Sequence, residues 1–236
     1  MSAAGAASGP GRRALVTGVS SGIGEAIART LLSSGWTVDG ISRSGATGLT
    51  GDFHDHRIDL SDVVAAAPRL AELPTPQAVV HAAGFMHAAP LGALDLAVGA
   101  RLWQLHVVAS ELLADSFSSR MAAGGRIVLI GSRTSRGAAG RSQYVATKAA
   151  MVGLARSWAA ELAPRGITVN VVAPGATETP MLTQSGRASS PPRLPPIGRY
   201  VQPQEVADLV QYLLSPSAAA ITGQELVICG GASVGP

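Results

Sequence analysis

The sequence predicts a single α/β domain built on a doubly wound parallel sheet, and three observations support this fold class. Short apolar runs typical of buried strands alternate with helical patterns along the chain. The 236 residues suit one large domain or two small ones, and no internal repeat divides them. Hydrophobic residues make up 47% of the chain, enough for a substantial core. Strands that alternate with helices pair in parallel, with helices on both faces of the sheet.

The first strand and helix are the most clearly marked elements. Arg13–Thr17 is an apolar run that ends at a glycine-rich turn, and a helix over Ile23–Ser34 is stopped by Gly35. Further short strands are expected at Thr37–Ser42, Arg57–Leu60, Ala78–His81, Arg126–Gly131, Ile167–Val171 and Glu225–Ile228. Further helices are expected at Ser61–Leu73, Leu94–Ala122, Ser142–Leu162 and Pro203–Leu214. The crossovers between parallel strands should be right-handed.

Two segments lie outside this alternation. Residues 1–11 are small, polar or turn-forming and are expected to be a disordered leader, which leaves 12–236 as the single domain. Gln184–Pro196 is rich in proline and serine, and its length suggests a mobile loop with a function, such as a substrate lid. The alternative is a solvated connection of no consequence.

Composition argues against several classes of function. The net charge of +3 comes from 18 Lys and Arg against 15 Asp and Glu, scattered singly, which gives no support for nucleic-acid binding. No apolar stretch reaches the roughly 18 residues of a membrane-spanning helix. Cys229 is the one cysteine and cannot form an internal disulfide, so a cytoplasmic protein is expected. We expect no metal site.

The turn after the first strand has the pattern of a phosphate-binding loop. TGVSSGIG places Gly18, Gly22 and Gly24 between that strand and the start of a helix. Glycines there allow a tight turn and let the backbone approach a pyrophosphate at the positive end of the helix. The alternative, an ordinary glycine turn, is made less probable by the position after an N-terminal strand.

Tyr144 and Lys148, in the segment YVATK, form a candidate proton-transfer pair. Their spacing of four puts both side chains on one face of the predicted helix. An ammonium beside a phenol favours the phenolate and lowers the tyrosine pKa, which suits a general acid or base. Taken alone, a Tyr/Lys pair at this spacing is usually a solvated helix face.

Together these motifs resemble those of the short-chain dehydrogenase/reductase family. The resemblance covers nearly the whole chain, because the motifs occur in the family's order: TGVSSGIG, Asp59-Leu60, Ser132 twelve residues before Tyr144, YVATK, NVVAPG, PPIGR and ITGQELVICGG. It implies a Rossmann-like sheet and an oxidoreductase that transfers hydride between a nicotinamide cofactor and a carbonyl or alcohol.

The resemblance also implies a role for each matching residue. Tyr144 would exchange a proton with the substrate oxygen, Lys148 would bind the nicotinamide ribose and tune Tyr144, and Ser132 would polarise the carbonyl. Tyr144 and Lys148 would also contact the cofactor. The other cofactor positions would be Gly18, Ser20, Ser21, Gly22, Ile23, Gly24, Ser42, Arg43, Asp59, Leu60, Ala83, Gly84, Pro174, Gly175, Thr177 and Thr179. A homotetramer or homodimer is expected, and the small residues of Met151–Ala163 would suit close helix packing.

The end of the second strand bears on the choice of cofactor. Enzymes that prefer NAD place an acidic residue there, whereas this chain has Ser42-Arg43. A hydroxyl and a guanidinium suit a 2′-phosphate, so the sequence favours NADP(H). Asp39 comes three residues too early and by alternation faces elsewhere. The alternative is that Arg43 merely points into solvent.

The chain departs from the family at two asparagine positions. His81-Ala82-Ala83-Gly84 replaces the usual NNAG, and His106 occupies the place of the active-site asparagine. The main-chain carbonyl of His106 would still be available to a water linked to Lys148. One hypothesis makes His106 a proton relay, since its ordinary pKa is near neutrality. The alternative is a partly buried histidine satisfied by one hydrogen bond.

The function that these observations favour is an NADP(H)-dependent interconversion of a ketone and a secondary alcohol. Substrate contacts are expected from Thr134, Ser135, Gln143, Phe85, Met86, Gly175 and the loop from Met181 onward. Arg133, Arg136 and Arg141 either attract an anionic substrate or only aid solubility. A 3-oxoacyl-(acyl-carrier-protein) reductase is the alternative enzyme, and a non-catalytic NADP(H)-binding regulator is the alternative of another class.

Overall fold

A computed structural model of the chain describes residues 11–183 and 190–234. Residues 1–10 of the predicted leader and residues 184–189 of the predicted lid lie outside these ranges. Seven parallel strands form one sheet in the order β3-β2-β1-β4-β5-β6-β7. The strands are β1 (Arg13–Thr17), β2 (Thr37–Ser42), β3 (Phe53–Arg57), β4 (Ala78–His81), β5 (Arg126–Ile130), β6 (Thr168–Pro174) and β7 (Glu225–Ile228). The predicted doubly wound, Rossmann-like fold is confirmed.

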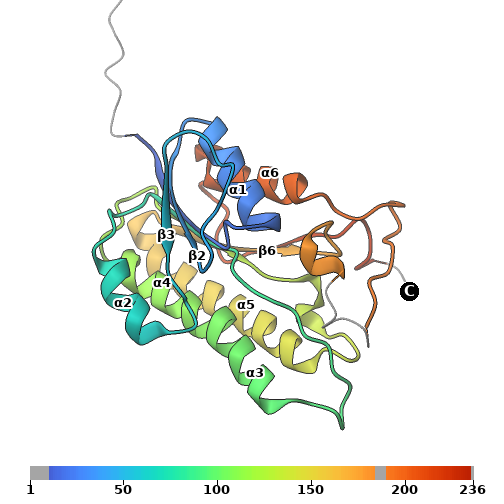
Figure 1. Cartoon of the computed structure of the whole chain (residues 1–236). Coiled ribbons are helices and arrows are strands. Elements are labelled where there is room, and N and C mark those ends of the chain that lie inside the picture. Colours follow the sequence, from blue (N-terminus) through green and yellow to red (C-terminus); the bar gives the residue numbers. More distant parts are fainter. Residues whose placement is uncertain (1–10, 184–189, 235–236) are drawn as a thin grey trace, which may run out of the picture.

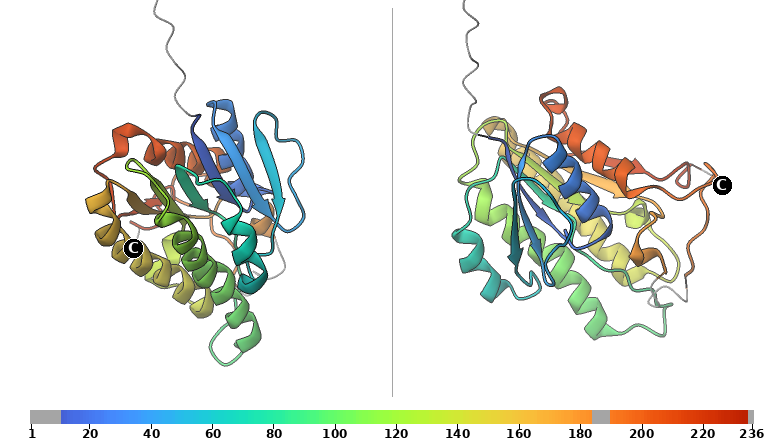
Figure 2. Two further views of the ribbon diagram at one scale, coloured as in Figure 1. Left: turned by 90° about the vertical axis from the view of Figure 1, so that its left-hand side faces the viewer. Right: turned by 45° about the horizontal axis from the view of Figure 1, so that its top comes forward.

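Helices cover both faces of the sheet, as Figure 1 and Figure 2 show. One face carries α1 (Gly22–Ser33) and α6 (Pro203–Leu214), which pack against each other. The other face carries α2 (Val63–Ala71), α4 (Ala109–Ser118) and α5 (Ser142–Leu162), with α3 (Leu96–Trp103) continuing into α4 through a π-helical segment, η1 (Gln104–Val108). The short 3₁₀ helices are η2 (Arg133–Arg136), η3 (Ala163–Arg165), η4 (Pro180–Thr183) and η6 (Pro216–Ala218).

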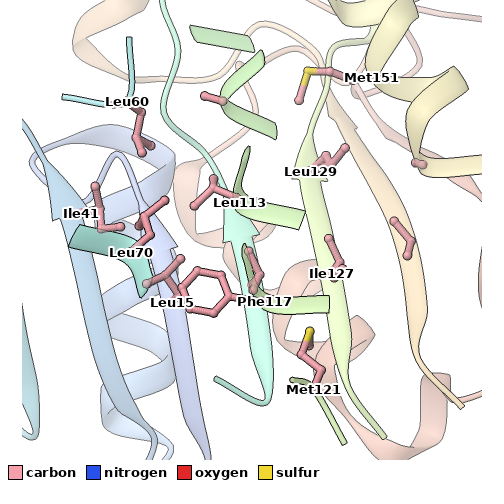
Figure 3. Packing of buried hydrophobic residues seen from close by; sticks show 14 of the residues in the cluster. Leu15, Ile41, Leu60, Leu70, Leu113, Phe117, Met121, Ile127, Leu129 and Met151 are labelled. Carbon is pink, nitrogen blue, oxygen red and sulfur yellow. The ribbon is translucent and has the colours of Figure 1, made fainter. Parts of the chain in front are cut away.

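Each face of the sheet has its own hydrophobic core. Leu15, Ile127 and Phe117 belong to the core beneath α2, α4 and α5, and Figure 3 shows how these side chains interdigitate. Ile27 and Val210 belong to the core beneath α1 and α6. Burying one large apolar side chain stabilises the fold by about 1.5–3 kcal/mol. Many such side chains in the two cores therefore hold the strands, and with them the strand ends that carry the site, in place.

The structure corrects one predicted strand and refines two other elements. The strand expected at Arg57–Leu60 is wrong, because β3 is Phe53–Arg57. Its sequence FHDHR is polar since it forms the sheet edge, whereas Ile58 and Leu60 are buried after the strand has ended. The single helix expected over Leu94–Ala122 contains the π-helical segment, and the strand expected at Ile167–Val171 runs on to Pro174.

The strand order reverses between β1 and β4, and this reversal positions the site. In an open parallel sheet, the loops after two such strands leave in opposite directions and form a crevice at their carboxyl ends. Within the described residues, no helix is both long and apolar enough to cross a membrane.

Candidate active site

A cavity of ≈ 380 Å³ lies at the carboxyl ends of the strands. Its size is that of a ligand site. All of the predicted cofactor positions and all four candidate catalytic residues, Ser132, Tyr144, Lys148 and His106, line this cavity. Residues that follow six different strands of the sheet, β1 to β6, therefore meet in one space.

The glycine-rich turn is packed too tightly for side chains. Gly18 has φ +76°, and a Cβ there would lie 2.9 Å from the Ala83 backbone. Gly22, with φ +61°, starts α1, and a Cβ would lie 3.1 Å from Thr179 Cγ2. Ser21, at the N-cap, makes no side-chain hydrogen bond to the first turn. The positive end of α1 is thus open to an anionic group, which suits a pyrophosphate.

The end of β2 presents a hydroxyl and a guanidinium. Ser42 is buried, and its Oγ has no hydrogen-bond partner among the described residues, although it lines the cavity. Arg43 is exposed and lines the same space. Asp39 is engaged elsewhere: its carboxylate accepts from Arg13 at 2.7 Å and from His56 at 2.9 Å. The end of β2 therefore lacks a carboxylate and holds a buried hydroxyl that needs a partner.

His81 ties β1 to the π-helical segment. The Thr17 hydroxyl accepts from the amides of Ala82 and Ala83 at 3.1 and 3.0 Å, so its own proton is donated to His81 Nδ1, at 2.9 Å. His81 Nε2 then donates to the carbonyl of Leu105 at 3.0 Å. Burial, followed by the nearby Lys148 charge, lowers the pKa of His81 to about 4, so this imidazole is neutral.

His106 is fully buried and makes two side-chain hydrogen bonds. Its Nε2 accepts from the Phe85 amide at 3.2 Å. Because the Thr147 hydroxyl donates to the Tyr144 carbonyl, His106 Nδ1 donates to Thr147 Oγ1, at 2.8 Å. Burial first, and then the charge of Lys148, lowers the pKa of His106 well below its ordinary value. This arrangement favours a structural link between the loop after β4 and α5, rather than proton relay through an imidazolium.

Tyr144 and Lys148 project from the first two turns of α5, as their spacing predicts. Lys148 Nζ lies 5.8 Å from the centre of the Tyr144 ring and donates to the Ile130 carbonyl at 2.8 Å. Burial lowers the pKa of Lys148 to about 7, so its proton is exchangeable near neutrality. Ser132 follows β5, and its Oγ lies 2.9 Å from Thr134 Oγ1. A phenol, an ammonium and a hydroxyl thus share one wall of the cavity.

The predicted substrate contacts divide into two groups. Thr134, Phe85, Met86, Gly175 and Met181 line the cavity, as do Arg133 and Arg141. Three others do not. Gln143 donates to the Asp95 carbonyl at 2.8 Å, Ser135 donates to Glu225, and Arg136 pairs with Glu225 at 3.7 Å.

Some residues of the cavity wall were absent from the sequence prediction. They include Leu105, Ile130 and Ala232, whereas Pro192 and Arg193 lie in the loop from Met181 onward that was expected to contact the substrate. Arg193 falls in the predicted lid segment, where the length of the loop had suggested a functional role. Ala232 follows β7, whose carboxyl end must lie at the same sheet edge as the others. The hydrogen bonds of His81 and His106 had no such signal in the sequence, because the partners of these histidines are distant along the chain.

Comparison with known proteins identifies the family. The family profile described as Enoyl-(Acyl carrier protein) reductase matches residues 18–233. The chain is 34% identical over 241 residues to 3-oxoacyl-(acyl-carrier-protein) reductase of Vibrio harveyi, covering 94% of this chain and 97% of the relative. The chain belongs to the short-chain dehydrogenase/reductase family. Its predicted membership is therefore confirmed, and the family consists of oxidoreductases that use a nicotinamide cofactor.

Solved structures of the short-chain dehydrogenase/reductase family share the fold. A dehydrogenase/reductase from Sinorhizobium meliloti 1021 is 34% identical with a TM-score of 0.86, covering 95% of this chain and 96% of its own. A 4-hydroxyisoleucine dehydrogenase complexed with NADH is 27% identical with a TM-score of 0.83, covering 95% and 100% of the two chains.

Proposed function

We propose that this protein is an NADP(H)-dependent oxidoreductase that interconverts a ketone and a secondary alcohol. The observation that carries the proposal is the shared cavity: Ser132, Tyr144 and Lys148 line the same space as the glycine-rich turn and the end of β2. A nicotinamide cofactor, when bound, supplies or accepts the hydride. The protein's own residues orient the substrate and the cofactor and supply a proton.

The cavity wall suits a cofactor with a 2′-phosphate. Ser42 Oγ is a buried hydroxyl without a hydrogen-bond partner among the described residues, and Arg43, next in sequence, is exposed and lines the same cavity. Asp39, the acid nearest in sequence, is held by Arg13 and His56 within the sheet. A phosphate would accept from both the hydroxyl and the guanidinium, which supports NADP(H) over NAD(H).

The catalytic wall suits proton transfer to a carbonyl oxygen. In the reducing direction the Tyr144 phenol would donate its proton to the substrate oxygen, and in the oxidising direction the phenolate would take it back. Lys148, anchored on the Ile130 carbonyl, would stabilise the phenolate and hold the ribose side of the cofactor. The Ser132 hydroxyl would donate to the same substrate oxygen and orient it.

The test is oxidation of NADPH, followed at 340 nm, across a panel of ketones, with NADH in parallel. Turnover with NADPH above NADH is the expected result. A well-folded protein that binds NADPH but turns over no ketone would overturn the proposal in favour of the non-catalytic regulator.

One alternative enzyme is favoured by a specific observation. The Vibrio harveyi relative is a 3-oxoacyl-(acyl-carrier-protein) reductase and aligns over nearly the whole chain. His106 and the absent NNAG asparagine count against that activity here. A pantetheine-linked 3-oxoacyl substrate assayed beside simple ketones separates the two, because a carrier-dependent reductase should strongly prefer the pantetheine thioester.

A further inference from the structure

The charges of the cavity are unevenly distributed between its ends. The charged residues on its described wall are Arg43, Asp59, Arg133, Arg141, Lys148 and Arg193. Asp59 and Arg43 follow β3 and β2, on the side of the sheet assigned to the cofactor. The remaining four are all cationic groups near or beyond β5, and no described carboxylate lines that end. Such a concentration of one sign of charge in a cleft attracts ligands of the opposite sign.

Arg133 and Arg193 both line the cavity. Arg133 follows Ser132 without a gap, is partly buried, and uses Nη1 to donate to the Ala232 carbonyl at 3.2 Å. Neither Arg133 nor Arg193 forms an ion pair with a described acid. By contrast, Arg136, three residues along the same segment, faces Glu225 outside the cavity. Glu225 also accepts a hydrogen bond from Ser135, so this carboxylate interacts with the 3₁₀ segment outside the cavity.

Arg141 braces this end of the cavity. It stands at the N-cap of α5, three residues before Tyr144. Its Nε donates to Ser190 Oγ at 2.8 Å and its Nη2 to the Ser190 carbonyl at 3.0 Å. The brace holds the start of the 190–195 segment, and hence Arg193, against the helix that carries the catalytic tyrosine.

Apolar residues complete the same end. Phe85, Met86 and Met181 line the cavity together with Pro192 and Pro195. A ligand that satisfies both features has an aliphatic or alicyclic body and a terminal anion. Guanidinium groups bind a carboxylate through paired, charge-assisted hydrogen bonds.

We infer that the substrate is a small oxo acid, or the matching hydroxy acid, whose carboxylate binds Arg133 and Arg193 while its carbonyl meets Ser132 and Tyr144. The inference rests on the proposed ketone–alcohol activity and specifies its substrate class. It predicts that charge on the substrate, rather than length alone, decides kcat/KM.

The experiment compares 3-, 4-, 5- and 6-oxo carboxylates with their methyl esters, using NADPH at fixed concentration. In the wild type, at least one acid should exceed its ester in kcat/KM by about 10-fold to 100-fold, the usual worth of hydrogen bonds to a charged group. In Arg193→Gln and Arg133→Gln this acid-to-ester ratio should fall toward one, mainly through KM. In Arg136→Gln, the matched control, the ratio should stay at the wild-type value. High salt should reduce the wild-type ratio.

The ratio is measured within each variant, so a general loss of activity does not imitate the expected result. Arg193 is exposed, which makes its variant the safer one for folding. Turnover of esters and simple ketones as fast as the acids would overturn the inference and leave the proposed function intact. An acid preference that survives both substitutions would overturn it as well. If neither acids nor neutral ketones react, the proposed function itself is wrong and the inference with it.

Discussion

The two ends of the cavity differ in whether main-chain atoms or side chains form most of the wall. The end proposed to hold the cofactor, here called the cofactor end, consists largely of backbone: Gly18 and Gly22 adopt positive φ, and neighbouring chain segments approach within contact distance. The end proposed to carry out proton transfer, here called the catalytic end, contains buried ionisable side chains, among them Lys148 and His106. The cofactor end is therefore sensitive to added atoms and to the loss of one surface charge. The catalytic end is sensitive to the loss of a proton-carrying group and to pH.

The largest effect is expected from removing the proton donor. Tyr144→Phe keeps the ring beside His106 and Lys148 but deletes the hydroxyl, so kcat should fall by about 10²-fold to 10⁴-fold, the range of general acid–base catalysis. NADPH binding, measured by fluorescence titration, should change little. Tyr212→Phe, on the exposed side of α6, is the control and should keep full activity. Equal losses of binding and turnover in Tyr144→Phe would contradict the division between the two ends.

A smaller effect, confined to binding, is expected at the end of β2. Arg43→Gln removes a charged donor for a 2′-phosphate, so NADPH affinity should fall by about 10-fold to 100-fold. NADH affinity should stay nearly constant, because NADH has no such phosphate. Arg29→Gln removes the same charge from the outer surface of α1, where it pairs with Glu25, and controls for net charge. If Arg43→Gln lowers the affinity for NADPH and NADH alike, the guanidinium does not bind the 2′-phosphate.

Two effects of replacing a glycine in the turn can be separated by experiment: the steric effect of the added Cβ and the strain of a positive φ. Gly22→Ala and Gly35→Ala both place a Cβ at positive φ, which costs about 1–2 kcal/mol of stability. A Cβ at Gly22 meets Thr179, whereas one at Gly35 meets nothing within 4 Å. The added methyl group forces Thr179 or the turn to shift, and both line the cavity, so Gly22→Ala should weaken NADPH binding about tenfold, the low end of the cost of overpacking. Gly35→Ala should lose only stability; loss of NADPH affinity in both variants would mean that strain, not shape, matters.

The same contrast explains how much could be predicted from sequence. The glycine turn and YVATK are local patterns, and the residues predicted from them all line one cavity. The edge strand Phe53–Arg57 was missed because its polar residues carry no apolar pattern, while Ile58 and Leu60 do. The hydrogen bond between Thr17 and His81 joins residues 64 positions apart, and that between His106 and Thr147 joins residues 41 apart. Such pairs are set by strand order and helix packing, which no local motif encodes.

The smallest effect on turnover, and the clearest on pH dependence, is expected at His106. In His106→Asn the side-chain amide can still donate to Thr147 from the position of Nδ1, and the main-chain carbonyl of residue 106 is retained. Only the hydrogen bond from the Phe85 amide to Nε2 is lost, so turnover at neutral pH should stay within a few-fold.

Stability in acid should change more. Both buried histidines have folded pKa values below the ordinary 6.5, that of His81 at about 4. The unfolded chain therefore binds more protons below pH 6.5, and the free energy of unfolding falls as pH decreases through that range. Each histidine contributes up to about 1.4 kcal/mol per pH unit, so His106→Asn should lower the slope by about that amount. Urea unfolding at pH 7, 6 and 5 measures it, and the slopes of the two proteins should coincide above pH 7. An unchanged slope together with a large turnover loss confined to low or high pH would instead make His106 a proton relay, and the catalytic end would then depend on three titrating groups.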